Sequence, residues 1–267
     1  MINYDKAIEA FKPYTDKMKL KLIACEVITR EVCWCVARTP HTVDMVFTPK
    51  GAHESGDLLR KTIQEEIDKT DQYSLVEYDA ILLGYGLCGN GTAGLSSKRY
   101  PLVIPRAHDC CTLFLGSRNR FKELFEDNPS RPYSSGGYME RGDSYLNESN
   151  MGASLGLDKS YEDYLELYGE ENAHYIMESI ESSEKDACKE LYFIDIPETS
   201  NPEKRKILLK EAESEGYDVT VQQGSLNLIQ NLLGGQWNDD YQIIPPGEKS
   251  VPLYDWDRVM GSTKSAN

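Results

Sequence analysis

Three cysteines follow three short apolar runs of the chain, each where the run ends. They are Cys25 after residues 20–24, Cys88 after residues 80–85, and Cys110 after residues 102–105. Short apolar runs closed by Gly, Pro or polar residues are typical of buried strands. Thiolates bind soft metal ions and iron-sulfur clusters. The residue types and their spacing therefore predict a metal or cluster site assembled from distant parts of the chain.

The segment PRAHDC adds a cation, an imidazole and a carboxylate beside the last of these thiols. A helix that begins near Asp109 would place Cys110 in its first turn, where the helix dipole favours a thiolate. Asp109 is interpreted either as the N-cap of that helix or as an acid-base group. We predict His108, Asp109 and Glu26, which follows Cys25, as catalytic residues, with Arg106 paired to Asp109 or binding an anionic substrate.

The segment GYGLCGNGTAG surrounds Cys88 with five glycines. Glycines let the backbone take positive φ and approach a ligand closely, which exposes amide N–H groups to anions or sulfur. The segment does not complete the GxGxxG fingerprint of dinucleotide binding. The residues predicted to bind a substrate are Arg106, Gly86, Gly89, Asn90 and Tyr138.

The other four of the seven cysteines are expected to stay outside the site. Cys33 and Cys35 would lie about 200° apart on a helix, so at most one of them could face it. Cys111 would point away from its neighbour Cys110, and Cys188 stands in a polar context far from the three loops. We predict no disulfide framework, because the number is odd and we expect a reducing compartment.

Composition limits the partners of the protein. The chain has 267 residues with 44 acidic and 29 basic side chains, giving a net charge of -15. Such a balance repels nucleic acid and anionic lipid surfaces. No apolar run approaches the roughly 20 residues that span a bilayer, and no signal peptide is recognised. We therefore expect a cytoplasmic protein that acts on a small molecule, with neither nucleic acid nor membrane as a partner.

The elements that would position the thiols alternate between strands and helices. This order predicts an α/β fold, a Rossmann-like parallel sheet flanked by helices, with two βαβ halves and the site at the carboxyl edge of the strands. The predicted strands are residues 20–24, 42–47, 80–85, 102–105, 191–196, 219–222 and 241–244. The predicted helices are residues 4–17, 27–37, 58–71, 161–182, 202–215 and 226–233, besides the one near Asp109.

We divide the chain into an N-terminal α/β half carrying the site, residues 1–127, and a C-terminal α/β half, residues 151–267. The segment between them, residues 128–150, is rich in Ser, Gly, Tyr and Pro. This composition indicates an interdomain linker or an active-site lid. Tyr133 and Tyr138 favour a lid that packs on another part of the protein.

Five motifs carry a resemblance to a known family: IACEV, LLGYGLCGNG, PRAHDC, LFLGS and YSSGGYME. Together they resemble domain-of-unknown-function family 1638, a prokaryotic family whose genes often lie near corrinoid-dependent methyltransferases. The resemblance is strong over residues 20–140 and weak beyond them, and Tyr138 stands where the family has a Trp. It implies a corrinoid protein or a methyltransferase as a partner but no established reaction.

Three functions remain open at this point. The first is a four-iron four-sulfur cluster held by Cys25, Cys88 and Cys110, with one iron open for a small molecule of one-carbon or sulfur metabolism, as in a lyase or transferase. The second is a zinc site of Cys88, His108 and Cys110 in a methyltransferase-type protein. The third is a metal-free accessory protein that binds a corrinoid or another small molecule, with the cysteines buried.

Overall fold

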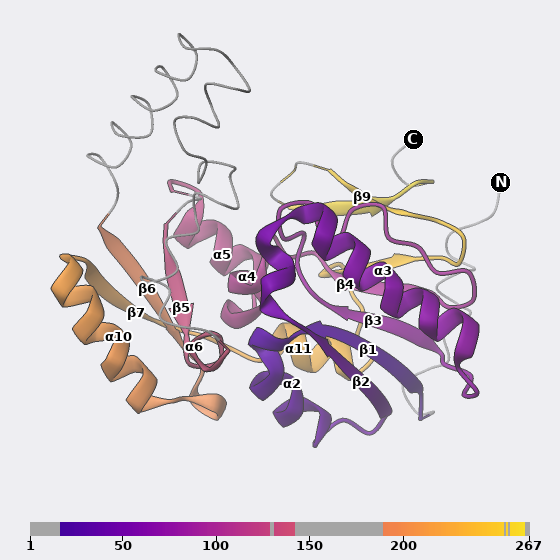
Figure 1. The fold of residues 1–267 in the computed structure, drawn as a ribbon, viewed down its shortest axis with the longest axis horizontal. Coiled ribbons are helices and arrows are strands. Elements are labelled where there is room, and N and C mark those ends of the chain that lie inside the picture. Colours follow the sequence, from indigo (N-terminus) through magenta and orange to yellow (C-terminus); the bar gives the residue numbers. More distant parts are fainter. Residues whose placement is uncertain (1–16, 129–130, 142–188, 254, 256, 265–267) are drawn as a thin grey trace, which may run out of the picture.

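A five-stranded sheet forms the centre of the molecule. The computed structural model describes residues 17–128, 131–141, 189–253, 255 and 257–264. The strand order is β2-β1-β3-β4-β8, with the first four strands parallel and β8 antiparallel to β4 (Figure 1). The bounds are β1 (Lys19–Cys25), β2 (Thr42–Thr48), β3 (Ala80–Gly84), β4 (Leu102–Pro105) and β8 (Tyr241–Ile244). The predicted mixed α/β fold with a mostly parallel sheet is confirmed.

Helices cover both faces of this sheet. The chain moves in opposite directions from β1 to β2 and from β2 to β3, so right-handed crossovers leave α2 and α3 on opposite faces. Leu59, Ile63 and Ile67 of α3 recur at a spacing of four and are fully buried, while α11 packs against β3, β4 and α2. The bounds are α2 (Thr29–Val36), α3 (Gly56–Tyr73) and α11 (Asn227–Leu233), with short helices η1 (Glu26–Ile28), η2 (Lys50–Glu54), α4 (Cys110–Leu115) and α5 (Arg118–Phe125).

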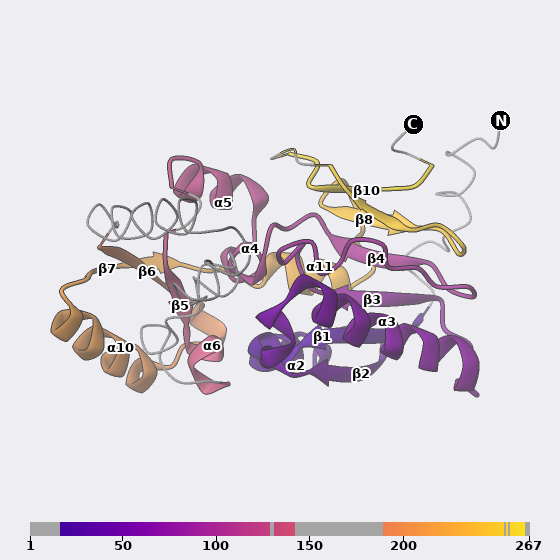
Figure 2. The same ribbon diagram turned by 45° about the horizontal axis from the view of Figure 1, so that its top comes forward.

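A second, three-stranded parallel sheet of order β5-β6-β7 lies beside the first (Figure 2). Its elements are β5 (Tyr133–Ser135), α6 (Gly136–Glu140), β6 (Glu190–Asp195), η3 (Pro197–Thr199), α10 (Pro202–Glu215) and β7 (Asp218–Gln223). Residues 133–140, expected within a linker or lid, thus form strand β5 of this sheet and the helix α6 that follows it. Asn201 caps α10 by accepting a hydrogen bond from Lys204 N, and Gly216 ends the helix at φ 75°.

Strand β8 corrects a second expectation. We expected residues 241–244 to extend a second βαβ layer, but β8 returns to the first sheet and pairs with β4. Leu102, Val103 and Ile104 of β4 are fully buried, and without β8 they would lie on an open edge. A short antiparallel hairpin follows, formed by β9 (Ser250–Pro252) and β10 (Met260–Ser262). The division into N-terminal and C-terminal halves stays a prediction.

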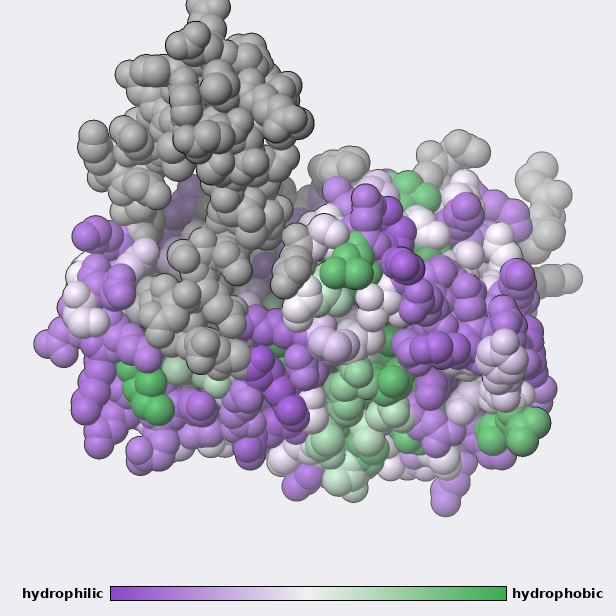
Figure 3. Space-filling view, in the orientation of Figure 1, coloured by the Kyte–Doolittle hydropathy of each residue, from purple (hydrophilic) through white to green (hydrophobic). Residues whose placement is uncertain are grey.

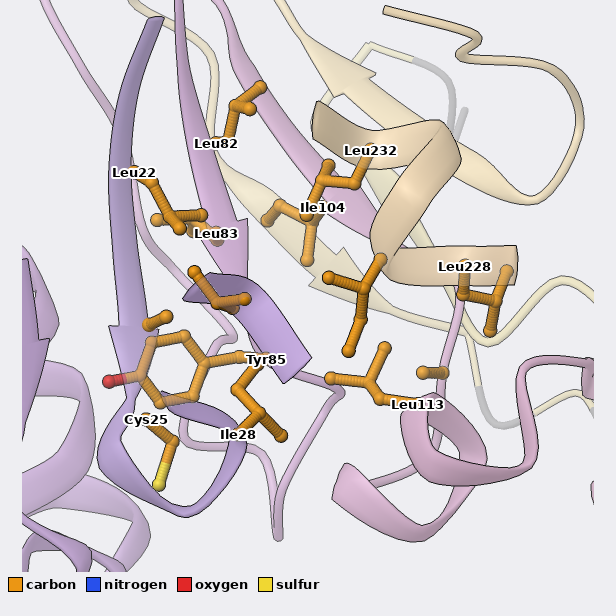
Figure 4. Close-up of a cluster of buried hydrophobic side chains, with 14 of the residues drawn as sticks. Leu22, Cys25, Ile28, Leu82, Leu83, Tyr85, Ile104, Leu113, Leu228 and Leu232 are labelled. Carbon is orange, nitrogen blue, oxygen red and sulfur yellow. The ribbon is translucent and has the colours of Figure 1, made fainter. Parts of the chain in front are cut away.

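The hydrophobic core runs from the first sheet towards the second. Figure 4 shows part of it, with Tyr85 and Cys25 at one end of the cluster. Hydrophilic residues cover most of the described part of the face in Figure 3, with hydrophobic ones in small patches. The predicted helices at residues 4–17 and 161–182, and Cys188, lie outside the described residues.

Candidate functional site

The candidate site lies where the strand order of the first sheet reverses. β2 pairs with one side of β1 and β3 with the other, so a crevice is expected beyond the carboxyl ends of β1 and β3. Cys25 is the last residue of β1, Cys88 lies four residues beyond β3, and Cys110 opens α4 after β4. All three predicted metal ligands therefore lie at one edge of one sheet.

The loop that carries Cys88 has an unusual backbone. Cys88, Gly89 and Asn90 all have left-handed φ angles, of 47°, 59° and 65°. For residues with a side chain this conformation costs about 1–2 kcal/mol each, and such strain clusters at functional sites. Of the five glycines in this segment, Gly89 and Gly94 have positive φ and the other three do not.

Neighbouring elements hold this loop in place. Arg60 of α3 donates from Nε to the Ala93 carbonyl (2.6 Å) and from Nη2 to the Asn90 carbonyl (3.0 Å). Ser250 of β9 donates from Oγ to the Thr92 carbonyl (2.6 Å). Because α3 and β9 both donate hydrogen bonds to the loop backbone, these neighbouring elements maintain its left-handed turn.

The loops of Cys88 and Cys110 are bonded to each other through their backbones. The Leu87 N–H donates to the Ala107 carbonyl (2.8 Å) and the Cys88 N–H to the His108 carbonyl (2.9 Å). Burial raises the pKa of the Cys88 thiol, and the nearby backbone groups of Gly86 and Cys110 oppose this shift. Amides directed at a cysteine sulfur are one way in which proteins tune metal-thiolate centres.

The three thiols share one electrostatic environment. Burial raises the pKa of Cys25 to about 11, and it also raises the pKa of Cys88 and Cys110 well above the ordinary value of a thiol. The Asp109 carboxylate and Cys25 also raise the pKa of both of the latter thiols, and Cys88 raises that of Cys110. The Lys50 ammonium acts in the opposite direction and lowers the pKa of Cys25. In the metal-free protein all three are therefore neutral thiols at pH 7.

The remaining described cysteines lie elsewhere. On α2, Cys33 is exposed and Cys35 is buried, so the two thiols face different surroundings, as their spacing predicted. Burial raises the pKa of Cys35 to about 12. Cys111 is fully buried in the core, and its pKa is also well above its ordinary value because of burial.

Asp109 has the structural role that the sequence allowed. Its side chain accepts a hydrogen bond from Thr112 N (3.2 Å) and caps α4. Burial of the carboxyl group raises its pKa from 3.8 to about 6, although the hydrogen bonds from α4 oppose the shift. The folded state therefore binds a proton at Asp109 more tightly than the unfolded chain does.

We predict a measurable loss of stability as this proton leaves. The contribution of protonated Asp109 is complete below about pH 4 and is lost as the pH rises through about 6. The free energy of unfolding of the metal-free protein should fall by about 3 kcal/mol over this window. Asp109→Asn keeps an N-cap but cannot titrate, so its free energy of unfolding, measured by chemical denaturation at each pH, should lack this decline. If the free energies of unfolding of the two proteins changed in parallel between pH 4 and 6, the prediction would be contradicted.

The structure places the other predicted catalytic and binding residues as follows. Glu26 accepts a hydrogen bond from Lys50 N (2.7 Å), and the His108 ring stacks on Phe121 with centroids 5.2 Å apart. Arg106 donates to the Arg258 carbonyl (2.7 Å), the Met260 carbonyl and Gln242 Oε1 (2.6 Å), so it fastens the C-terminal segment to β4. The roles of these residues with a substrate stay predictions.

Tyr138 and Lys50 form a pair beside Cys25. Tyr138 lies on α6, and the Lys50 ammonium nitrogen is 4.5 Å from the centre of its ring. Lys50 was not predicted from the sequence, although it follows a predicted strand at the same sheet edge, where the same rule places ligand-binding residues.

Tyr133 was also missed as a site residue. Its hydroxyl oxygen lies 3.0 Å from Cys110 Sγ. The sequence identified Tyr133 only as an aromatic residue of a lid, because nothing in the sequence places β5 against α4.

Within the described part of the chain, no three His, Cys, Asp or Glu side chains are arranged to hold a single metal ion. The zinc set of Cys88, His108 and Cys110 is thus not assembled as one coordination sphere. The cysteines of a cluster each bind a different iron, so they stand further apart than ligands of one ion. Cys25, Cys88 and Cys110 lie at one edge of the sheet, and their role as ligands of a cluster stays a prediction.

Comparison with known proteins gives one match. A family model described as a protein of unknown function, DUF1638, matches residues 47–233, which include Cys88, Cys110 and Tyr133 but not Cys25. No curated protein and no solved structure matches. Among the helices that the structure describes, none is both long enough and apolar enough to span a membrane.

Proposed function

The chain belongs to the DUF1638 family, and we propose that Cys25, Cys88 and Cys110 hold a four-iron four-sulfur cluster with one iron left for a small-molecule substrate. The observation that supports this most is the placement of three thiols at one edge of one sheet, with Cys25 and Cys88 after the two strands that flank the switch point and Cys110 after the next strand. Crevices at switch points are where doubly wound sheets bind their ligands.

The electrostatics support a cationic occupant. Burial raises the pKa of the thiols of Cys25, Cys88 and Cys110, and a nucleophilic cysteine would need the opposite environment. A metal centre supplies positive charge that deprotonates the thiols it binds. The donor set therefore fits a metal centre better than it fits thiol catalysis.

The chain's own residues would fix the ligands and leave one side of the centre open. Arg60 and Ser250 donate hydrogen bonds to backbone carbonyls of the Cys88 loop, and Asp109 caps the helix that begins at Cys110. Burial raises the pKa of the Cys25 thiol, and the backbone groups of Val27 and Glu26 oppose this shift. When bound, the cluster would supply a Lewis-acidic iron to which a small molecule can coordinate.

Metal analysis after anaerobic purification and reconstitution with iron and sulfide tests the proposal. About four iron and four sulfide per chain are expected, with a visible charge-transfer band. The matched control is protein alkylated at its thiols before reconstitution, which should bind neither. One equivalent of zinc without iron uptake would instead support the Cys88, His108 and Cys110 site. If the protein bound neither iron nor zinc, the result would instead support a metal-free protein that binds a small molecule.

A further inference from the structure

Tyr133 reaches the candidate site from the second sheet. It opens β5, whereas Cys110 opens α4 after the first sheet, and its hydroxyl oxygen is 3.0 Å from Cys110 Sγ. Aromatic side chains surround the ring, with Phe125 edge-on at 6.3 Å between centroids and Tyr138 at the same separation. The hydroxyl is therefore positioned by packing.

The chemistry of the two groups sets the direction of this hydrogen bond in a metal-bound protein. A thiol and a phenol can each donate, but a thiolate that binds a metal has no proton left. The phenol O–H must then be the donor. Hydrogen bonds to a charged acceptor are roughly twice as strong as bonds between neutral groups.

We infer that Tyr133 is a positioning residue of the centre, whose hydroxyl donates a hydrogen bond to the Cys110 sulfur, stabilises the thiolate and ties the second sheet to the site. The metal-bound part of this inference depends on the proposed cluster. A hydrogen bond to a ligating sulfur favours the more negatively charged, reduced state of a cluster, so Tyr133 would raise its reduction potential.

Tyr133→Phe tests the inference without removing the ring. The matched control is Tyr192→Phe, because Tyr192 is paired with Tyr133 in register on the neighbouring strand and also packs on Phe125. In the metal-free protein, alkylation of Cys110 by iodoacetamide is followed by peptide mass spectrometry at a fixed alkaline pH. Tyr133→Phe should slow it about tenfold, because the thiolate loses its donor. A change that only loosened the packing would expose the thiol and speed the reaction.

The second readout uses the reconstituted protein. Tyr133→Phe should keep the wild-type iron and sulfide content, while its reduction potential shifts to a lower value and that of Tyr192→Phe does not. If no protein binds iron, the proposed cluster fails, but the alkylation rates still decide the role of Tyr133. Equal or faster alkylation in Tyr133→Phe would overturn the inference whether or not a cluster forms.

Discussion

Cys88→Ser should lower the iron bound after reconstitution by about tenfold or more, because losing a ligand costs at least as much as losing the groups that orient one. A serine hydroxyl is a hard, weakly acidic donor and replaces a thiolate poorly at an iron-sulfur cluster. The loop offers no substitute, since Arg60 holds its left-handed backbone in one conformation. Iron and sulfide per chain, measured on the same sample, give the result.

Cys33→Ser is the matched control for this variant. It makes the same atomic change at an exposed thiol on α2, outside the group of three, and should keep the wild-type iron content. Chemical denaturation of both metal-free variants separates a missing ligand from a misfolded chain. Full iron content in a folded Cys88→Ser protein would contradict the assignment of Cys88 as a ligand.

The sequence was sufficient to place the three thiols because their position depends on local patterns. An apolar run that ends in a turn predicts a buried strand, and parallel strands share a carboxyl edge. Cys25, Cys88 and Cys110 could therefore be assigned to one edge before their contacts were known. The N-cap role of Asp109 was likewise open to prediction, since it depends only on the residues of its own turn.

Contacts between distant elements could not be predicted in this way. Nothing local distinguishes a strand that extends the second sheet from β8, which covers the exposed edge of β4. The Ser- and Gly-rich composition around Tyr133 indicated a loop, yet pairing with β6 makes it a strand. Tertiary pairing overrode local propensity in both places, and the second case concealed the contact between Tyr133 and Cys110.

Gly86→Ala should prevent the two cysteine loops from meeting. A Cβ atom at Gly86 would lie 2.6 Å from Asp109 N and 2.8 Å from the Ala107 carbonyl oxygen. Both are backbone atoms of the loop that carries Cys110, so no side chain can rotate away and one loop must move. We expect a loss of about 3 kcal/mol or more in the free energy of unfolding, measured by denaturant titration, because overpacking at a backbone contact relaxes poorly.

The same loop provides the control, because Gly89→Ala makes the identical change where no atom lies within 4 Å of the added Cβ. Gly89 has a φ of 59°, so the backbone strain should cost only about 1 kcal/mol. If contact between the loops assembles the site, Gly86→Ala should also lose bound iron in conditions where it is still folded, whereas Gly89→Ala should keep it. Equal stabilities for the two variants would show that the loops can separate without cost, and the thiols would then not be held together by the backbone contact at Gly86.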